Sequence, residues 1–413
     1  MRRALALVLC AAAAGAAPPV VTEAEYAQRR QTLAGSLTDG AAVLFGVTED
    51  QAEDFREPFH QEPNFFYLTG WMEPGAILLV LPESAPEPRE ILFLPSHSPM
   101  RERYTGPRAA ASDNNISARS GFKHVEPTKS FEGRLAGVFR ESWKVYTIPG
   151  QPSSERLKSL LPRNETHSLL PLLAPLRARK SAAEIALIQR SVDASIAAHR
   201  AAWNRLGAGV AEYQVAAAMT AALMDAGCGR NAYAPVIGSG PNSIVLHYSA
   251  NTRRMEEGDV VLMDAGAECA GYAADITRTL PAGKEFTPRQ RQVYDAVLGA
   301  QRAAIAAAKP GASMRDMQKA ALDYLNAHGG LGKHLIHGVS HHVGLEVHDP
   351  QPPGGALEPG MVITAEPGVY LPDEGFGIRI EDTLLITETG ARVMSAALPS
   401  DWDTIRRQRN HLR

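Results

Sequence analysis

The sequence predicts an α/β N-terminal domain followed by an α+β domain that is built from an internal pseudo-twofold repeat. Three observations lead to this prediction. Residues 23 to about 175 alternate short apolar runs with helical patterns, whereas the chain after residue 180 begins with long amphipathic helices. Within this second part, glycines and acidic residues recur about 102 positions apart. We therefore expect one domain over residues 23–175 and a second domain over residues 176–400.

The composition is that of an ordinary globular protein. Of the 413 residues, 45% are hydrophobic and 21% are charged, which excludes a disordered tail protein, a collagen and a coiled coil. Lys and Arg total 42 against 45 Asp and Glu, so the basic excess typical of nucleic-acid-binding proteins is missing and no nucleic acid is expected as a partner. Three cysteines exclude a disulfide scaffold. The sequence leaves open whether Cys228 and Cys269 pair.

Residues 1–16 are predicted to be a signal peptide. A basic start at residues 1–3 precedes an apolar run at residues 4–14, and Ala-Gly-Ala at residues 14–16 fits a cleavage site. The apolar run is too short to cross a membrane. The residue before Cys10 is not a small one, as a lipoprotein would need. We therefore expect an exported protein, periplasmic or secreted, without stable membrane association after processing; an Ala-rich leader without this function is the alternative.

The N-terminal domain is predicted to contain four buried strands, because four short apolar runs are bounded by turn residues. These runs are residues 41–46, 65–70, 76–81 and 91–95. Pro162, Pro171 and Pro175 then mark a linker to the second domain. The basic run at residues 177–180 follows the linker, and we expect it to be a solvated face rather than a binding patch.

Four helices are predicted in the second domain. They begin at Ser181, Ala211, Thr287 and Ser313. The first opens with a capping box formed by Ser181 and Glu184, and the third has Pro288 at the tolerated first position. The second and fourth helices are expected to end at Gly227 and Gly329, because glycine commonly follows a helix C-terminus.

The two halves of the second domain repeat the same residues. The matching segments are residues 258–266 with 360–368, 271–277 with 377–383, and 245–247 with 346–348. Asp264 is thus followed 102 positions later by Glu366, and Asp275 is followed 106 positions later by Glu381. Two such units should pack around a pseudo-twofold axis. We therefore expect polar groups from both halves to converge on one pocket.

These four carboxylates point to chemistry rather than to structure. Asp264 ends an apolar strand and Asp275 begins the next, so one turn between the strands would form a hairpin on which the two face each other. Neighbouring carboxylates repel, and burying them requires a metal ion, protons or arginine partners. Arg278 and Arg379 are the arginines beside them in the sequence.

Five of the 13 histidines fall within residues 334–348 and offer a further ligand. One imidazole with four carboxylates suits a pair of divalent cations such as Mn²⁺, Fe²⁺, Co²⁺ or Zn²⁺. Two metal ions that share a water molecule lower its pKa, so the reaction class is metal-assisted hydrolysis. The sequence contains neither a Gly-x-Ser-x-Gly elbow nor a His-Glu-x-x-His zinc helix.

Residues 175–390 resemble the pita-bread metallopeptidase family, which includes aminopeptidase P, prolidase and methionine aminopeptidase. The matching stretches are residues 180–185, 237–248, 264–266, 271–279, 337–349, 366–370 and 377–382. The resemblance implies a pita-bread fold for the second domain. It also implies two divalent metal ions as cofactors, with Mn²⁺ as the expected metal.

The resemblance assigns a role to each candidate residue. The implied metal ligands are Asp264, Asp275, His341, Glu366 and Glu381. Asp275 and Glu381 would bridge the two metals, His341 and Glu366 would bind one of them, and Asp264 would bind the other. Glu366 would also shuttle the proton of the attacking water.

The resemblance implies that the other site residues act on the substrate. His247, His337 and His348 would steady the scissile carbonyl and its developing oxyanion. Tyr370 and Arg379 would be substrate-binding residues. His342 departs from the family, where an aromatic residue or glycine is common at this position, and it could compete with His341 as a ligand.

The N-terminal domain narrows the expected activity. Residues 26–33, 55–56 and 61–70 resemble the leading domain of aminopeptidase P and prolidase, which methionine aminopeptidases generally lack. The resemblance implies an Xaa-Pro aminopeptidase that acts on peptide substrates with proline at the second position and that forms a homo-oligomer. An Xaa-Pro dipeptidase (prolidase) and a non-metal pita-bread hydrolase or binding module are the alternatives.

Overall fold

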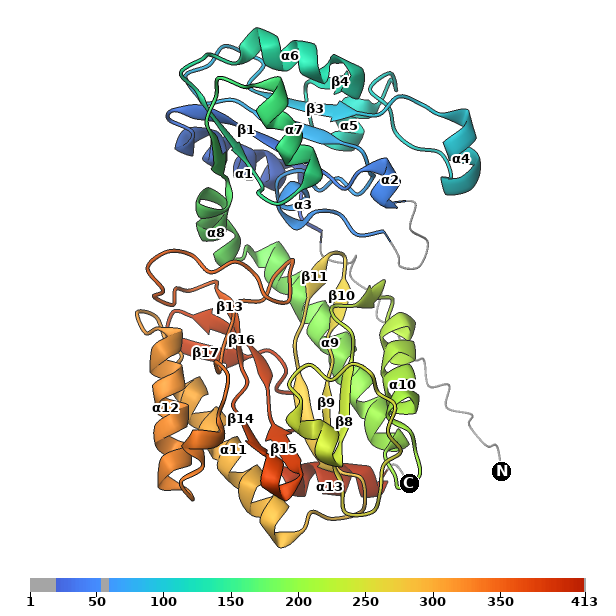
Figure 1. The fold of residues 1–413 in the computed structure, drawn as a ribbon, viewed down its shortest axis with the longest axis vertical. Helices are drawn as coiled ribbons and strands as arrows, with labels where there is room; N and C mark the ends of the chain where they lie inside the picture. Colours follow the sequence, from blue (N-terminus) through green and yellow to red (C-terminus); the bar gives the residue numbers. More distant parts are fainter. Residues whose placement is uncertain (1–19, 53–58, 412–413) are drawn as a thin grey trace, which may run out of the picture.

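The computed structural model describes residues 20–52 and 59–411 and consists of two domains stacked along the long axis of the molecule (Figure 1). Helix α8 (Leu170–Ala178) connects them. The predicted signal peptide, residues 1–16, lies outside the described residues. Among the helices of the described ranges, none is long and apolar enough to span a membrane.

The N-terminal domain is built on a six-stranded mixed sheet with the order β4-β3-β2-β1-β5-β6. Its strands are β1 (Gly40–Phe45), β2 (Ile77–Val80), β3 (Glu90–Leu94), β4 (Val125–Pro127), β5 (Lys144–Thr147) and β6 (Thr166–Ser168). Successive side chains of a strand point to opposite faces, so Val43 joins the core on one face while Ala42 and Leu44 join the core on the other. Because both faces of β1 are covered, its sequence is a continuous apolar run.

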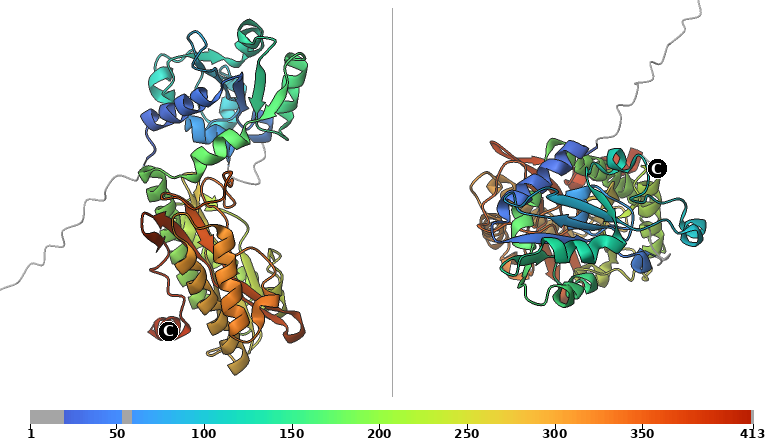
Figure 2. Two further views of the ribbon diagram at one scale, coloured as in Figure 1. Left: turned by 90° about the vertical axis from the view of Figure 1, so that its left-hand side faces the viewer. Right: turned by 90° about the horizontal axis from the view of Figure 1, so that it is seen from above.

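Short helices cover the two faces of this sheet (Figure 2). Helix α1 packs on one face, and α6 and α7 pack on the other. The helices of this domain are α1 (Glu23–Ser36), α2 (Glu49–Ala52), α3 (Pro63–Thr69), α4 (Pro99–Thr105), α5 (Ile116–Ser120), α6 (Phe131–Val138) and α7 (Pro152–Leu160), with the 3₁₀ turn η1 (Thr128–Ser130).

The apolar run at residues 65–70 is helix α3 and not the strand that we expected. The carboxylate of Glu62 caps the helix by accepting a hydrogen bond from the backbone N–H of Phe65 at 2.6 Å, and Pro63 occupies its first turn. Gly70 ends the helix in the left-handed region with φ = 65°. The helix is buried on most sides and has no polar face, so its periodicity cannot be distinguished from that of a buried strand.

The second domain combines long helices with short strands. Its helices are α9 (Ala182–Arg205), α10 (Glu212–Asp225), α11 (Pro288–Ala307), α12 (Met314–Ala327) and α13 (Trp402–His411), with the 3₁₀ turns η2 (Gly240–Ile244), η3 (Leu331–His334) and η4 (Pro372–Glu374). The first four helices are the predicted ones. Ser181 and Glu184 form the predicted capping box of α9.

The strands of the second domain form four small sheets. Two three-stranded sheets have the orders β12-β9-β8 and β13-β16-β17, a third has the order β11-β10-β7, and β14 pairs with β15. The strands are β7 (Arg230–Asn231), β8 (Val236–Ser239), β9 (Val260–Asp264), β10 (Ala267–Cys269), β11 (Tyr272–Ala273), β12 (Thr277–Pro281), β13 (Val362–Ala365), β14 (Gly368–Leu371), β15 (Phe376–Arg379), β16 (Asp382–Thr387) and β17 (Gly390–Val393).

Equivalent backbone hydrogen bonds in the two halves confirm the internal repeat. The N–H of Gly209 donates to the carbonyl of Met255 at 2.8 Å, and 102 residues later the N–H of Gly311 donates to the carbonyl of Leu357 at 2.9 Å. Both glycines have φ near 80°, a left-handed conformation that other residues rarely adopt. Figure 1 shows α9 and α10 on one side of the domain and α11 and α12 on the other.

The basic run at residues 177–180 is not the solvated face that we expected. Arg177 and Lys180 are 2% and 6% exposed, and both form ion pairs with Asp349, whereas Arg179 remains exposed. The acidic partner that replaces water lies about 170 residues away in the sequence, so local charge patterning could not indicate it.

Cys228 and Cys269 form a disulfide bond. The bond joins the segment after α10 to β10 across a sequence separation of 41 residues. The enclosed loop includes β8 and β9 and therefore most of the first half of the strand layer.

Candidate metal centre and substrate pocket

A cavity of about 580 Å³ lies between the two halves of the second domain. Its size suits a short peptide or a similar small ligand. The polar residues that line it come from both halves and are Tyr233, His247, Ser249, Asp264, Asp275, His337, Ser340, His341, His348, Glu366, Arg379 and Glu381. The structure thus brings the predicted site residues together in one cavity, except that Tyr370 lies just behind its wall.

Each half places its two carboxylates at the ends of paired strands. Asp264 is the last residue of β9, which pairs antiparallel with β12 so that Asp264 lies opposite Thr277. Glu366 and Glu381 take the corresponding places after β13 and before β16. The expected single turn between Asp264 and Asp275 is wrong, because the chain forms β10 and β11 after β9 and before β12. Strand pairing nevertheless places both carboxylates on the cavity.

His341 and not His342 faces these carboxylates. His341 Nε2 lies 3.5 Å from Asp275 Oδ2 and 3.3 Å from Glu366 Oε1. Asp275, His341 and Glu381 each offer a ligand atom within 4.8 Å of the others. His342 is 4% exposed and forms backbone bridges to Asp349 and Ile363, away from the cavity lining.

Burial makes the charges of this cluster costly. Burial raises the pKa of Asp264 to about 6 against the opposing charge of Arg379, and it raises the pKa of Glu366 to about 7 against that of His341. Burial and the charge of Asp275 hold the pKa of Glu381 well above its usual range. By contrast, burial is outweighed at Asp275, where the hydrogen bond and charge of His341 lower the pKa.

His341 carries the complementary shift. Burial would lower the pKa of its ring, but the hydrogen bond to Asp275 and the charges of Asp275 and Glu366 raise it to about 9. Asp264, Glu366, Glu381 and His341 therefore all hold their protons to higher pH than isolated groups do, at the place where cations could bind. Glu381 Oε1 is also buried without a hydrogen-bond partner. An acceptor of this kind, among carboxylates and one imidazole, fits a divalent metal ion.

Arg379 and Tyr233 support the carboxylates from behind. Arg379 is 3% exposed, and its guanidinium donates to Asp264, to the hydroxyl of Tyr370 at 2.8 Å and to Thr277 Oγ1 at 3.2 Å. The hydroxyl of Tyr233 contacts both Asp264 and Asp275. Tyr233 cannot be singled out from the sequence, because a single tyrosine without a recurring spacing carries no signal.

The hydrogen bonds of His337 define its tautomer. Its Nδ1 lies 2.9 Å from the carbonyl oxygen of Gly338, which can only accept, so Nδ1 carries the proton. Its Nε2 then accepts from the hydroxyl of Tyr370 at 2.9 Å, which itself receives a hydrogen bond from Arg379. Burial lowers the pKa of His337 to about 4, which keeps the ring neutral.

His247 and His348 lie at the exposed part of the cavity. The ring of His348 stands edge-on to that of His341 with a centroid distance of 4.2 Å. The segment with His247 is held by Glu212 at the start of α10, a residue that no sequence motif singles out. The completely buried carboxylate of Glu212 accepts hydrogen bonds from Ser239 N–H, Ser239 Oγ, Asn242 Nδ2, Tyr248 Oη and Arg253 N–H.

Two protein families match most of this chain. Residues 186–388 match the metallopeptidase family M24, and residues 26–146 match the aminopeptidase P N-terminal domain. The first match covers all four carboxylates and the four histidines of the cavity. The second covers the sheet of the N-terminal domain from β1 to β5.

Individual relatives are similar over nearly the whole chain. The Xaa-Pro aminopeptidase of Escherichia coli is 31% identical, over 92% of this chain and 96% of its own. The Xaa-Pro aminopeptidase 3 of Homo sapiens is 31% identical, over 95% of this chain and 87% of its own. The solved structure of aminopeptidase PepP from Pseudomonas aeruginosa superposes with a TM-score of 0.87 at 29% identity, covering 95% of this chain and 99% of that chain. Proline aminopeptidase P II from Yersinia pestis gives a TM-score of 0.85 at 30% identity, covering 95% and 100%.

Proposed function

This chain belongs to the Xaa-Pro aminopeptidases of metallopeptidase family M24, and we propose that it hydrolyses its substrates at a dinuclear centre whose ligands converge from both halves of the second domain. It is a pita-bread metallopeptidase that removes the N-terminal residue of peptides in which proline follows. The proposed metal ligands are Asp264, Asp275, His341, Glu366 and Glu381.

The convergence of this donor set on one cavity is the observation that carries the proposal. Asp264, Asp275 and Glu381 are at most 8% exposed, which is a costly arrangement for carboxylates. Within the described ranges, only two cationic side chains contact one of these three carboxylates directly. They are His341, beside Asp275, and Arg379, which donates to Asp264 alone. A pair of divalent cations would satisfy the others, including the unpaired Oε1 of Glu381.

The residues around the centre are suited to proton transfer. When bound, divalent metal ions supply Lewis-acid activation of water and of a carbonyl group. We propose that the carboxylate of Glu366, which lies 3.3 Å from His341 Nε2, accepts a proton from the attacking water and returns it to the leaving amine. The hydroxyl of Thr364 donates to Glu366 Oε1 at 3.3 Å and orients it.

The histidines are proposed to act on the substrate. His247 and His348 line the exposed part of the cavity, where a peptide enters, and we assign them to the scissile carbonyl and its developing oxyanion. His337 is held neutral and fixed by Tyr370, which suits a group that orients the peptide rather than one that exchanges protons.

We propose Mn²⁺ as the metal, since carboxylate oxygens dominate the donor set and hard divalent cations prefer oxygen ligands. The test compares hydrolysis of Xaa-Pro-Yaa peptides with that of Xaa-Pro dipeptides by chelated protein reloaded with Mn²⁺, Co²⁺ or Zn²⁺. We expect cleavage of the longer peptides before proline, with Mn²⁺ giving the highest rate. Cleavage of dipeptides alone would identify a dipeptidase, and full activity of the chelated protein would exclude the metal centre.

We also propose that the protein is exported and forms a homo-oligomer. The basic and apolar leader at residues 1–16 supports export, and the disulfide between Cys228 and Cys269 is typical of an oxidising compartment. Met100 and Tyr104 on α4 are 75% and 80% exposed and offer apolar surface for self-association. Light scattering on purified protein would measure the oligomeric state, and a monomer at all concentrations would contradict the proposed homo-oligomer.

A further inference from the structure

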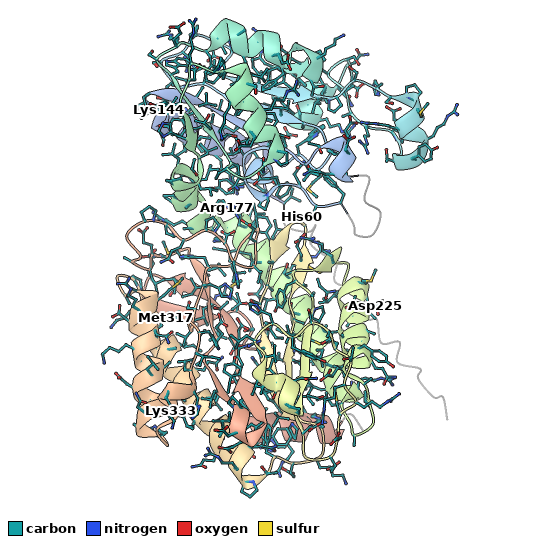
Figure 3. The ribbon with its side chains drawn as sticks, viewed as in Figure 1. His60, Lys144, Arg177, Asp225, Met317 and Lys333 are labelled. Atoms are coloured by element: carbon teal, nitrogen blue, oxygen red, sulfur yellow. A yellow bond between two sulfur atoms is a disulfide. The ribbon has the colours of Figure 1, made fainter. Side chains whose placement is uncertain are left out.

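A buried charge network joins the two domains beside the histidine segment of the cavity. Its centre is Arg177, in the last turn of α8 and at the junction of the domains (Figure 3). Arg177 is 2% exposed. Its Nη1 donates to Asn64 Oδ1 of the N-terminal domain at 2.6 Å, and its Nη2 donates to Asp349 Oδ1 at 2.5 Å and Glu346 Oε2 at 2.9 Å.

Asp349 is held from both of its oxygens. While Arg177 binds Oδ1, Lys180 Nζ donates to Oδ2 at 3.1 Å. The backbone also closes around this carboxylate, because a Cβ atom at Gly344 would lie 2.5 Å from Oδ2 of Asp349. The position of Asp349 is therefore fixed by three separate contacts.

Asp349 in turn fixes the ring of His341. The backbone N–H of Asp349 donates to the carbonyl oxygen of His342 at 2.9 Å. The same oxygen lies 3.0 Å from Nδ1 of His341, which must therefore carry a proton. This leaves Nε2 of His341 directed toward Asp275 and Glu366.

We propose that Arg177 is a positioning residue for the metal centre, acting through Asp349 and the His342 carbonyl on the orientation of the His341 ring. This inference rests on the proposed metal-binding function of His341. Partners that hold the second nitrogen of a metal-binding histidine typically change metal affinity by about 10- to 100-fold when they are removed. Asn64 orients the guanidinium, so the N-terminal domain contributes to the geometry of a centre to which it supplies no ligand.

Arg29 provides a matched control for the structural role of a buried interdomain arginine. It is 6% exposed, donates to the carbonyl of Tyr67 at 3.0 Å and lies 3.1 Å from Glu184 at the start of α9. Like Arg177, it joins the N-terminal domain to the second domain through a buried carboxylate. Glu184 does not line the cavity, so loss of Arg29 weakens domain docking without reaching His341.

The experiment compares Arg177→Met, Arg177→Lys and Arg29→Met in the full-length protein. Co²⁺ is titrated into chelated protein, and its binding constant and visible absorption spectrum are recorded beside the melting temperature. We expect both Arg177 variants to bind Co²⁺ about tenfold less tightly at the site that includes His341, and with an altered spectrum. Lysine should not rescue binding, because its ammonium group cannot reproduce the planar guanidinium that binds Asn64 and Asp349 together. Arg29→Met should lose melting temperature but keep the wild-type affinity and spectrum.

The inference is overturned if Arg177→Lys binds Co²⁺ with the wild-type affinity and spectrum, or if Arg29→Met changes both as strongly as Arg177→Lys does. Should Arg177→Met fail to fold, Arg177→Lys decides alone, since it keeps the charge. Wild-type protein that binds no Co²⁺, or a His341→Ala variant that binds it normally, would instead refute the proposed metal centre. The two failures are therefore distinguishable.

Discussion

His341 Nε2 from the second half of the repeat lies 3.5 Å from Asp275 Oδ2 from the first half. The contact raises the pKa of His341 to about 9 against the effect of burial, and it lowers the pKa of Asp275 against the same effect. The pair is thus an ion pair across the pseudo-twofold axis of the domain. A metal ion between the two side chains would replace the proton on His341 Nε2, so removal of either partner affects both halves of the centre.

Replacing a carboxylate that is proposed to bridge the metals should remove metal and activity but not the fold. We expect Asp275→Asn or Glu381→Gln to lower the bound metal from two ions toward one or none and to reduce kcat by roughly 10²-fold or more. Without metal, Glu381→Gln should be at least as stable as the wild type, because it relieves repulsion between buried carboxylates. Metal analysis, kcat and thermal melting of the chelated protein measure these effects. Asp373→Asn, an exposed change on η4, is the control, and two bound metals with full activity in either test variant would contradict the bridging assignment.

Stability of the chelated protein should fall as pH rises above about 6.5, and metal should reverse the loss. The pKa values of Asp264 and Glu366 rise from 3.8 and 4.5 to about 6 and about 7 on folding, so these groups destabilise the folded chain increasingly up to those values. The pKa of His341 rises from 6.5 to about 9, so its stabilising effect is complete below 6.5 and is lost through about 9. Both effects have the same sign.

Below about pH 6.5 the buried rings of His337 and His342, whose pKa values burial lowers to about 4, oppose this trend, because they would have to be protonated there. We therefore expect the melting temperature of chelated protein to decline between about pH 6.5 and about pH 9, and the increase caused by Mn²⁺ to widen between about pH 5 and about pH 9. Calorimetry in buffers of different ionisation enthalpy should also detect protons released by metal binding at neutral pH. If the increase in melting temperature caused by Mn²⁺ stays constant across this range, the metal does not displace protons from Asp264, Glu366 and His341.

The repeat could be predicted from the sequence because it consists of residues whose type is required by the local backbone or by the site. Gly209 and Gly311 occupy equivalent left-handed positions, while Asp264 ends β9 and Glu366 directly follows the equivalent strand β13. The sequence spacing between such residues does not depend on how the surrounding side chains pack. The order of the helices and the carboxylates on the cavity could therefore be predicted without coordinates.

Features that depend on distant partners could not be predicted in this way. Arg177 and Lys180 look like surface residues until Asp349 is placed beside them by the fold. Helix α3 is covered by both domains and therefore lacks a polar face, so the helical period of about 3.6 residues cannot be seen in its pattern of apolar residues. Tyr233 reaches two carboxylates from a segment that has no motif of its own.

Export predicts a defined N-terminus. If residues 1–16 are removed as a signal peptide, N-terminal sequencing of protein from the native host should begin near Ala17. Protein made without this segment in a reducing compartment should contain free thiols at Cys228 and Cys269, whereas exported protein should not. Abundant soluble protein that retains Met1 would contradict the assignment.

Glu212 should matter for catalysis without binding metal. Glu212→Gln keeps the size of the side chain but directs an amide NH₂ at groups that donate to the carboxylate, so we expect the free energy of unfolding to fall by about 1–3 kcal/mol. Loosening of the His247 segment should lower kcat/KM by about tenfold while two metals stay bound. Chemical denaturation, kinetics and metal analysis measure these effects. Glu256→Gln, whose side chain is 74% exposed, is the matched control, and equal kinetics for the two variants would exclude a positioning role for Glu212.

The histidines of residues 337–349 should separate into a metal ligand, a substrate group and a structural residue. His341→Ala removes the ring that faces Asp275 and Glu366, so metal content and rate should both fall. His348→Ala should keep both metals but lose roughly 10²–10³ in kcat, because it removes the proposed donor to the developing oxyanion. His342 is buried away from the cavity with a pKa lowered to about 4 by burial, so His342→Ala should cost some stability but far less activity than either. Metal stoichiometry and kcat on an Xaa-Pro-Yaa peptide distinguish the three variants, and metal loss in His342→Ala with metal retained in His341→Ala would move the ligand by one residue and refute the proposed centre.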